Sequence, residues 1–161
     1  YAATMAGMAF ANAFLGICHS LAHKMGAEFH IPHGLANALL INQVIRFNQT
    51  NNPNKLTAFP QYKFPMSEER YAELATALGL KGKTNSDKVD ALINAITEMK
   101  KQLDIPLSIA DAGVDRKNFE AKVDELAELA FDDQCTGANP RYPFIEELKG
   151  IYRNAYEGID K

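Results

Sequence analysis

The residues of this chain that are best suited to do chemistry are its histidines, which are crowded together. All four of them, His19, His23, His30 and His33, fall within the fifteen residues 19–33. His19 and His23 are four residues apart, so on a helix their rings project from the same face. Neutral imidazoles that converge on one point are good ligands for a divalent transition metal. The cluster therefore predicts a metal site near the N-terminal end of the chain.

Which histidines bind the metal is left open by their spacing. A single helical histidine is more often a hydrogen-bonded core or surface residue than a ligand, and this alternative applies to each of the four. Spacing alone nominates His19 with His23, as in other metal-binding pairs four residues apart. Pro32 and Gly34 restrict the backbone around His33, however, and a tight return of the chain could bring His33 back against His19.

Two apolar helices are expected to position the cluster. The first 22 residues carry no Asp, Glu, Lys or Arg. Their pattern predicts one long helix over about Ala3–Lys24, apolar on all sides and therefore buried inside a larger protein. Glycine and proline then break the pattern, which predicts a short loop at about residues 27–32. A second apolar helix is predicted from about His33 to Phe47.

The rest of the chain also has helical periodicity and no pattern typical of a strand. An irregular segment is expected over about residues 49–66. Four further helices are predicted from caps and breakers: one from Ser67 to Leu78, one starting at Ser86, one capped by Asp115, and one with Pro143 in its first turn that ends near Tyr156. The predicted fold class is all-α, a helical bundle of six or seven helices in one domain over residues 1–161.

Composition disfavours several classes of function. Hydrophobic residues make up 47% of the 161 residues and charged residues 23%, which suits a folded domain with a core. The net charge is −3 and no Lys/Arg-rich run occurs, so no nucleic-acid partner is expected. The two cysteines, Cys18 and Cys135, cannot make a disulfide framework, and a cytoplasmic location is expected.

The uncharged N-terminal stretch is long enough in principle to cross a bilayer. It contains Asn12, His19 and Ser20, polar groups that are costly in lipid, so no membrane span is expected. A secretory signal is not expected either, because no basic residues precede the apolar run. The chain opens on Tyr1, directly in a core-like helix, which favours a fragment of a larger protein.

A longer motif surrounds the histidines. The run GICHSLAHKMG at positions 16–26, followed by IPHGLANA at 31–38, resembles the histidine motif of the iron-dependent alcohol dehydrogenases, G-x-x-H-x-x-A-H-x-x-G…P-H-G-x-x-N-A. Two later runs, AFPQYKFP at 58–65 and CTGANPRYP at 135–143, are similar to the alcohol dehydrogenase half of the bifunctional aldehyde–alcohol dehydrogenases. The resemblance covers nearly the whole chain and implies the helical C-terminal subdomain of such an enzyme.

The resemblance implies a role for each histidine. In that family one Asp and three His hold the metal, and His19 and His33 match two of the histidine ligands. His23 matches a residue near the nicotinamide and the substrate oxygen, where it would act in catalysis and cofactor binding. His30 matches no fixed ligand. The resemblance thus selects His33, where spacing alone would have selected His23.

Three other residues match positions that border the substrate pocket in the family. Phe10 and Leu15 lie before His19 on the predicted first helix, and Cys135 lies beside an Asn-Pro-Arg turn. Plain core packing is an equal alternative for Phe10 and Leu15, and a buried structural thiol is an equal alternative for Cys135.

Parts of the family's site have no counterpart here. The other two ligands of the family lie in a D-x-x-x-H arrangement, and no histidine precedes His19. No Gly-rich strand-to-helix turn that could hold a pyrophosphate is present either. The expected partner of this chain is therefore the N-terminal nucleotide-binding half of the same enzyme.

The implied function is the interconversion of acetaldehyde and ethanol with NAD. The metal, Fe²⁺ by family or Zn²⁺, would act as a Lewis acid while the cofactor transfers hydride, and His23 would pass a proton or orient the nicotinamide. The chain alone is expected to be inactive and to form a homo-oligomer through its uncharged helix. Two alternatives are a non-catalytic helical assembly module and an unrelated metal carrier with a two-histidine site. The carrier is disfavoured because neither cysteine lies at metal-pair spacing from the cluster.

Overall fold

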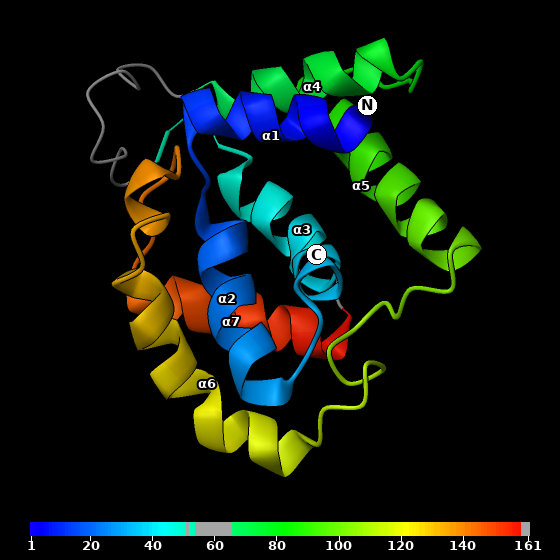
Figure 1. Cartoon of the computed structure of the whole chain (residues 1–161). Helices are drawn as coiled ribbons and strands as arrows, with labels where there is room; N and C mark the ends of the chain where they lie inside the picture. The colour runs from blue at the N-terminus through cyan, green and yellow to red at the C-terminus, as the bar shows by residue number, and fades with distance from the viewer. Residues whose placement is uncertain (51, 54–65, 159–161) are drawn as a thin grey trace.

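The computed structural model describes residues 1–50, 52–53 and 66–158, and these residues form seven α-helices (Figure 1). The helices are α1 (Ala2–Ala13), α2 (Ile17–Phe29), α3 (His33–Asn48), α4 (Ser67–Ala77), α5 (Asn85–Gln102), α6 (Arg116–Phe131) and α7 (Ile145–Glu157), with a 3₁₀ turn, η1 (Thr136–Ala138), before α7. No β-strand occurs in this described part. The all-α prediction with six or seven helices is confirmed, whereas the predicted irregular segment at 49–66 lies mostly outside the described residues.

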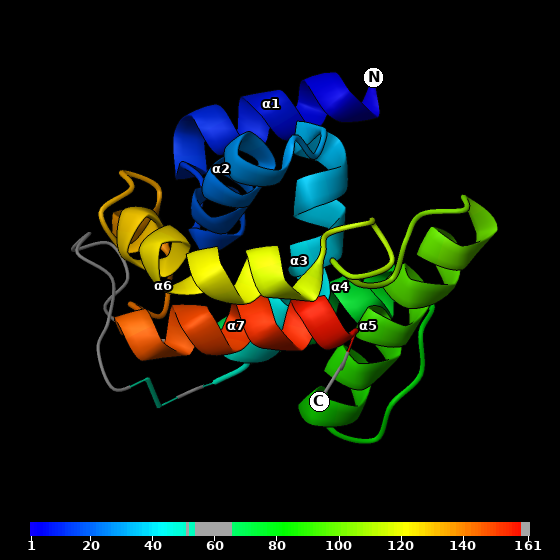
Figure 2. The same cartoon turned by 90° about the horizontal axis from the view of Figure 1, so that it is seen from below.

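The main core is built by α2, α3, α6 and α7. Figure 2 shows α6 and α7 side by side, and α2 and α3 pack on them and on each other. Each of the four helices contributes side chains with almost no exposed surface: Ile17, Leu21 and Met25 from α2, Leu40 from α3, Phe119 and Val123 from α6, and Leu148 and Tyr152 from α7. The Tyr152 hydroxyl donates a hydrogen bond of 2.8 Å to the Leu21 carbonyl. The helix that carries His19 and His23 is therefore anchored on three sides.

A hairpin of α4 and α5 packs against α3 through a smaller apolar cluster of Ile45, Val89 and Ile93. The start of each helix depends on which side chain can reach its free backbone N–H groups. Thr84 caps α5, two residues before the predicted start at Ser86, because its oxygen accepts the N–H three residues further on. Ser67 is the first helical residue of α4 rather than its cap, and Pro143 lies just before α7 rather than inside its first turn. Asp115 caps α6 as predicted.

The predicted single helix over Ala3–Lys24 is wrong, because the chain breaks between α1 and α2. The two helix axes differ in direction by 112°. Phe14 ends α1 in the left-handed region, at a φ of 65°, and Gly16 precedes α2 in an extended conformation. In an amphipathic sequence a break interrupts the alternation of apolar and polar residues. This stretch is apolar on all sides, so its pattern does not change at the break and the break could not be predicted.

A buried asparagine pair fixes the position where α2 begins. The Asn139 Oδ1 atom accepts hydrogen bonds of 3.3 Å from the Ile17 N–H and from the Asn48 amide. Its Nδ2 donates to Asn48 Oδ1 at 2.7 Å and to the Arg141 carbonyl at 2.6 Å. A Cβ atom on Gly16 would lie 2.7 Å from Asn139 Oδ1, so only glycine fits there. Since His19 lies in the first turn of α2, this network also places that histidine.

We expect Gly16→Ala to lower the free energy of unfolding by about 2 kcal/mol, as overpacking typically does. Asn139 cannot move away from the new methyl group without losing hydrogen bonds in a buried site. The matched control is Gly150→Ala in α7, where nothing lies within 4 Å of the added Cβ. The control should leave stability unchanged or raise it by up to about 1 kcal/mol. Denaturant unfolding followed by circular dichroism measures both, and equal midpoints would contradict the argument.

The first helix lies at the edge of the bundle (Figure 2). None of its residues is buried in this chain, and Met5, Met8 and Phe10 are largely exposed. The burial that we predicted for this helix is therefore not provided by the described residues. No single described helix is long and apolar enough to span a membrane, although α1 and α2 taken together pass that test despite the sharp bend between them.

Candidate metal centre

Three of the four histidines converge where α2 turns back into α3. The ring centroids of His19 and His33 are 5.4 Å apart, those of His23 and His33 are 5.5 Å apart, and those of His19 and His23 are 6.0 Å apart. His19 and His23 come from one face of α2, and His33 is the first residue of α3. The tight return that was expected to bring His33 back against His19 is confirmed. Because His23 and His33 are exposed, the cluster opens to the surface.

His30 has a structural role in the backbone, unlike the other three histidines. It ends α2 in the left-handed conformation, with φ 55° and ψ 35°, and its N–H donates to the Gly26 carbonyl. This backbone geometry makes the return between the two helices possible. The exposed ring is not part of the triangle formed by His19, His23 and His33.

The environment of His19 favours the form that binds metals. Partial burial is the largest cause that lowers the pKa of His19 below the ordinary histidine value, and the charges of His33 and His23 lower it further. Desolvation and like-charge neighbours both disfavour the imidazolium. His19 is therefore neutral at physiological pH and keeps a nitrogen lone pair free for a metal.

His33 is oriented by Asn37, one turn further along α3. The Asn37 amide nitrogen lies 3.2 Å from His33 Nε2 and also donates to the His33 carbonyl at 3.0 Å. In this metal-free arrangement the Asn37 NH₂ group faces His33 Nε2, and a metal bound through Nε2 would take the place of this contact. Asn37 Oδ1 is buried and has no hydrogen-bond partner in the described part of the chain. Two adjacent imidazoles beside an unpaired buried oxygen fit the partial coordination shell of a divalent metal.

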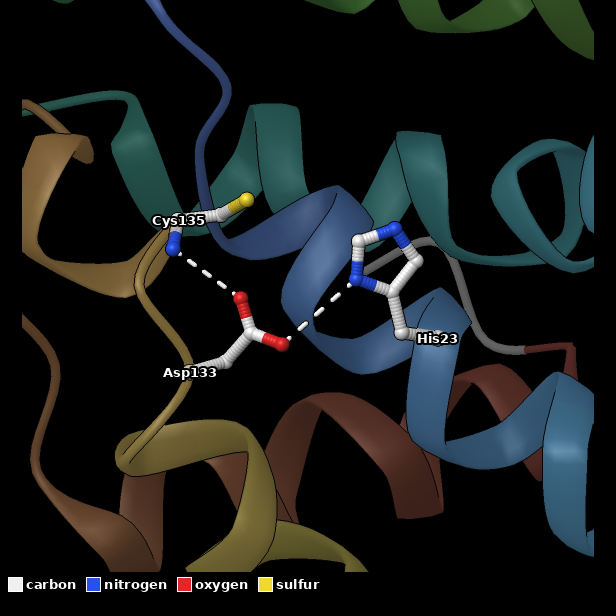
Figure 3. A group of neighbouring side chains, drawn as sticks. All are labelled: His23, Asp133 and Cys135. Carbon is white, nitrogen blue, oxygen red and sulfur yellow. Dashed lines mark hydrogen bonds and ion pairs between the residues drawn. The ribbon is translucent and has the colours of Figure 1, made fainter.

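A second polar cluster, in the turn after α6, lies beside His23 (Figure 3). Asp133, in the turn after α6, has its Oδ2 atom 2.9 Å from the Lys24 ammonium and 3.5 Å from His23 Nδ1. Its Oδ1 accepts the N–H of Cys135 at 2.9 Å. Burial raises the pKa of the Asp133 carboxyl, but the hydrogen bonds from Lys24 and Cys135 outweigh burial and bring this pKa to about 2. Asp133 is thus ionised at neutral pH.

His23, Asp133 and Cys135 offer three ligand atoms that all lie within 4.8 Å of one another, the one such group in the described residues. The Lys24 ammonium already balances the charge of Asp133, however. Burial, followed by the influence of Asp133, raises the pKa of the Cys135 thiol to about 11, so the thiol is protonated at neutral pH. The cluster is therefore balanced in charge without a metal.

The three predicted pocket residues fall in different places. Phe10 is exposed on α1, and Leu15 is half-buried in the break before α2, so neither lies on the helix of His19 as we had assumed. Cys135 is buried next to Asp133. Their role in a pocket stays a prediction, but its geometric basis for Phe10 and Leu15 is wrong.

Sequence reasoning missed Asp133, Lys24 and Asn37. Asp133 is 110 residues from His23, and no local pattern connects two residues so far apart. Asn37, in contrast, lies one turn after His33 in the same helix, and this spacing could have identified it.

Comparisons with known proteins point to one family. Residues 1–156 match the model of the C-terminal part of the Fe-containing alcohol dehydrogenase family. The chain is 58% identical to the bifunctional aldehyde-alcohol dehydrogenase AdhE of Escherichia coli over 161 residues, which are 99% of this chain and 18% of that enzyme. It is 55% identical to the aldehyde-alcohol dehydrogenase of Clostridium acetobutylicum over 157 residues, 98% of this chain and 18% of that protein.

Solved structures share the fold. The iron containing alcohol dehydrogenase from Thermococcus thioreducens superposes with a TM-score of 0.77 at 37% identity, over 98% of this chain and 36% of that chain. The chain therefore corresponds to about a third of that structure and spans about a fifth of the length of the two curated relatives.

Proposed function

This chain belongs to the Fe-containing alcohol dehydrogenase family through its match to the C-terminal part of that family, and from this premise we propose that it is the helical, metal-binding half of an enzyme that interconverts acetaldehyde and ethanol with NAD. The observation that carries the proposal is the triangle of His19, His23 and His33, 5.4–6.0 Å apart, at the junction of α2 and α3. The names of the relatives, aldehyde-alcohol dehydrogenases, support the substrate class.

His19 and His33 would hold the metal, Fe²⁺ by family or Zn²⁺, since imidazole nitrogens accept both. The lowered pKa of His19 and the unpaired oxygen of Asn37 beside His33 support this pair. When bound, the ion supplies Lewis-acid polarisation of the substrate oxygen. The protein's contribution is to disfavour the charged form of His19 and to bring the two rings within 5.4 Å of each other.

His23 would act beside the metal rather than on it. Its Nδ1 atom is turned toward Asp133, which leaves Nε2 as the atom that can face a substrate or a nicotinamide. This arrangement supports a role of His23 in catalysis and cofactor contact. Cys135, next to Asp133, is the best placed of the proposed pocket residues, whereas Phe10 and Leu15 would reach a pocket only from α1 and the break.

The rest of the site would come from a partner, the nucleotide-binding half of the same enzyme. His19 and His33 form no group with a carboxylate ligand within the described residues, and two imidazoles fill only half of a four-ligand shell. The 18% share of the relatives' length and the exposed apolar helix α1 support a partner of this kind. We place the enzyme in the cytoplasm and expect it to be a homo-oligomer.

One observation favours a second candidate function. The exposed apolar side chains of α1 are typical of an interaction surface, so the chain could be a non-catalytic helical assembly module. Such a module would associate without binding metal or converting a substrate. Metal content and turnover in the full-length enzyme separate the two proposals.

We expect the full-length enzyme to contain about one iron per chain and to oxidise NADH in the presence of acetaldehyde, whereas the isolated 161-residue chain should show no turnover and partial metal at most. The isolated chain offers two of the imidazoles and no site for the cofactor's phosphates. Elemental analysis after dialysis and an NADH oxidation assay measure both properties. Stoichiometric iron with turnover in the isolated chain would contradict the half-enzyme proposal, and a full-length enzyme inactive on acetaldehyde would contradict the proposed reaction.

A further inference from the structure

The carboxylate of Asp133 is held in one orientation by groups from two distant parts of the fold. Its Oδ1 accepts the Cys135 N–H at 2.9 Å, within its own turn. Its Oδ2 is 2.9 Å from Lys24 Nζ, on α2. The side chain of Asp133 is 8% exposed, so water does not compete strongly for these oxygens. With both oxygens engaged, the carboxylate cannot rotate without losing a charge-assisted hydrogen bond.

The same Oδ2 atom faces the ring of His23. The separation of 3.5 Å between Oδ2 and His23 Nδ1 is long for a hydrogen bond, as is common for such contacts in unliganded sites. Figure 3 shows Asp133 between Cys135 and His23, with the far edge of the imidazole turned away from the carboxylate. A carboxylate only accepts, so the facing nitrogen of a neutral ring must carry the proton.

We infer that Asp133 is a positioning residue for His23: it accepts a hydrogen bond from Nδ1–H and so leaves the lone pair of Nε2 on the edge of the ring that is turned away from the carboxylate. Lys24 holds the carboxylate ionised and in place. A carboxylate that accepts a hydrogen bond from one ring nitrogen fixes the tautomer of catalytic and metal-binding histidines in the same way. The consequence for catalysis rests on the proposed function, whereas the orientation of the ring does not.

The inference gives His23 a defined chemical capacity. With Nδ1 protonated, Nε2 is an acceptor and can take a hydrogen bond from an alcohol hydroxyl or from an N–H or O–H group of the cofactor. With the other tautomer, Nε2–H would be a donor and could bind only an acceptor atom, so it could not take a proton from the alcohol. The backbone N–H of Cys135 and the ammonium of Lys24 act on His23 only through Asp133.

The first test is a spectroscopic one on the isolated chain and needs neither metal nor activity. Nitrogen-15 NMR of labelled histidine at about pH 8, where an ordinary imidazole is neutral, distinguishes a protonated from an unprotonated ring nitrogen. We expect His23 to carry its proton on Nδ1. Asp133→Leu, which removes the acceptor, should shift His23 to Nε2–H or to a mixture of tautomers, and Asp133→Asn, whose oxygen can still accept, should restore Nδ1–H at least in part.

The matched control is Asp132→Asn, which changes an exposed carboxylate on the neighbouring residue and should leave the His23 signals unchanged. Asp133→Asn keeps the shape of the side chain, so its spectrum remains informative even where Asp133→Leu does not fold. If His23 carries its proton on Nε2 in the unaltered chain, or if its tautomer does not respond to either substitution at Asp133, the inference is wrong.

The second test is kinetic and uses the full-length enzyme. Asp133→Asn, which keeps an acceptor oxygen, should lower kcat only slightly. Asp133→Leu should lower kcat on the order of 10- to 100-fold, the usual effect of removing a histidine's orienting partner, with iron content and the KM for acetaldehyde little changed. In a His23→Ala background the same substitution should have no further effect, because Asp133 acts only through that ring. An equal loss in both backgrounds would overturn the inference. If the unaltered enzyme does not convert acetaldehyde at all, the proposed function is wrong, but the NMR test of the His23 tautomer still applies.

Discussion

Replacing His19 or His33 with alanine is expected to remove the metal from the full-length enzyme and to lower kcat by about 1,000-fold or more. Each substitution deletes one of the two imidazoles that we propose as metal ligands. The Lewis acid contributes several kcal/mol of charge stabilisation, and each 1.4 kcal/mol corresponds to about tenfold in rate. Iron per chain, measured by elemental analysis after dialysis, and acetaldehyde-dependent NADH oxidation check the two parts of this prediction.

The other two histidines are the controls for this experiment. His23→Ala should keep the metal and lose rate, by about 100-fold, because His23 contacts Asp133 and would act beside the ion. His30→Asn should keep both metal and rate, since His30 only ends α2 and asparagine tolerates its left-handed backbone. If His23→Ala lost the metal while His33→Ala kept it, the assignment of His33 as a ligand would be wrong.

The isolated chain is expected to self-associate through α1, as a dimer at tens of micromolar. Met5 and Met8 are 68% and 66% exposed and Phe10 is 48% exposed, on a helix that carries no charged side chain. Soluble monomers rarely leave a continuous apolar surface of this kind open to water. Burial of α1 against a second copy would remove that surface, at about 25 cal/mol for each Å² of apolar area. Multi-angle light scattering measures the result.

Lysine substitutions locate the contact. The double variant Met5→Lys with Met8→Lys should return the chain to a monomer, because a charged side chain cannot be buried in an apolar contact without a partner. Leu74→Lys on α4, where the leucine is 55% exposed, is the matched control and should leave the association unchanged. A clean monomer for the unaltered chain, or a dimer that persists in the double variant, would count against α1 as the contact surface.

Most of the helices could be predicted from the sequence because their signals are local. The apolar stripe of α5, with Val89, Leu92 and Ile93 buried, repeats at the helical period. Asp115 caps α6 through a hydrogen bond to a backbone N–H only three residues away. Such patterns depend on the nearest turn of chain and not on packing, so they are visible without a structure. Caps that depend on the exact first residue, as at Ser67 and Ser86, were wrong by one or two positions.

The candidate site could be predicted in part. The crowding of four histidines within fifteen residues predicted a metal site, and the resemblance to a known family selected His19 and His33. Spacing alone could not decide, because the structure brings His23 as close to His33 as His19 is. The direction of the helix return decides which rings meet, and this direction depends on the left-handed conformation of His30.

The sequence by itself determined the helices that have a regular apolar pattern or a capping residue, and it identified the residue types that can bind a metal. Only the tertiary structure decided where the first apolar stretch breaks and which distant group acts on His23. The break at Gly16 depends on Asn139, which accepts a hydrogen bond from the Ile17 N–H although the two residues are 122 positions apart. The orientation of His23 depends on Asp133, which is 110 positions away in the chain. Contacts between groups so far apart form only once the core of α2, α3, α6 and α7 has packed. The physical reason is that a hydrogen bond requires the two groups to be near in space, and in these two cases nearness in space is set by burial of the core and not by order along the chain.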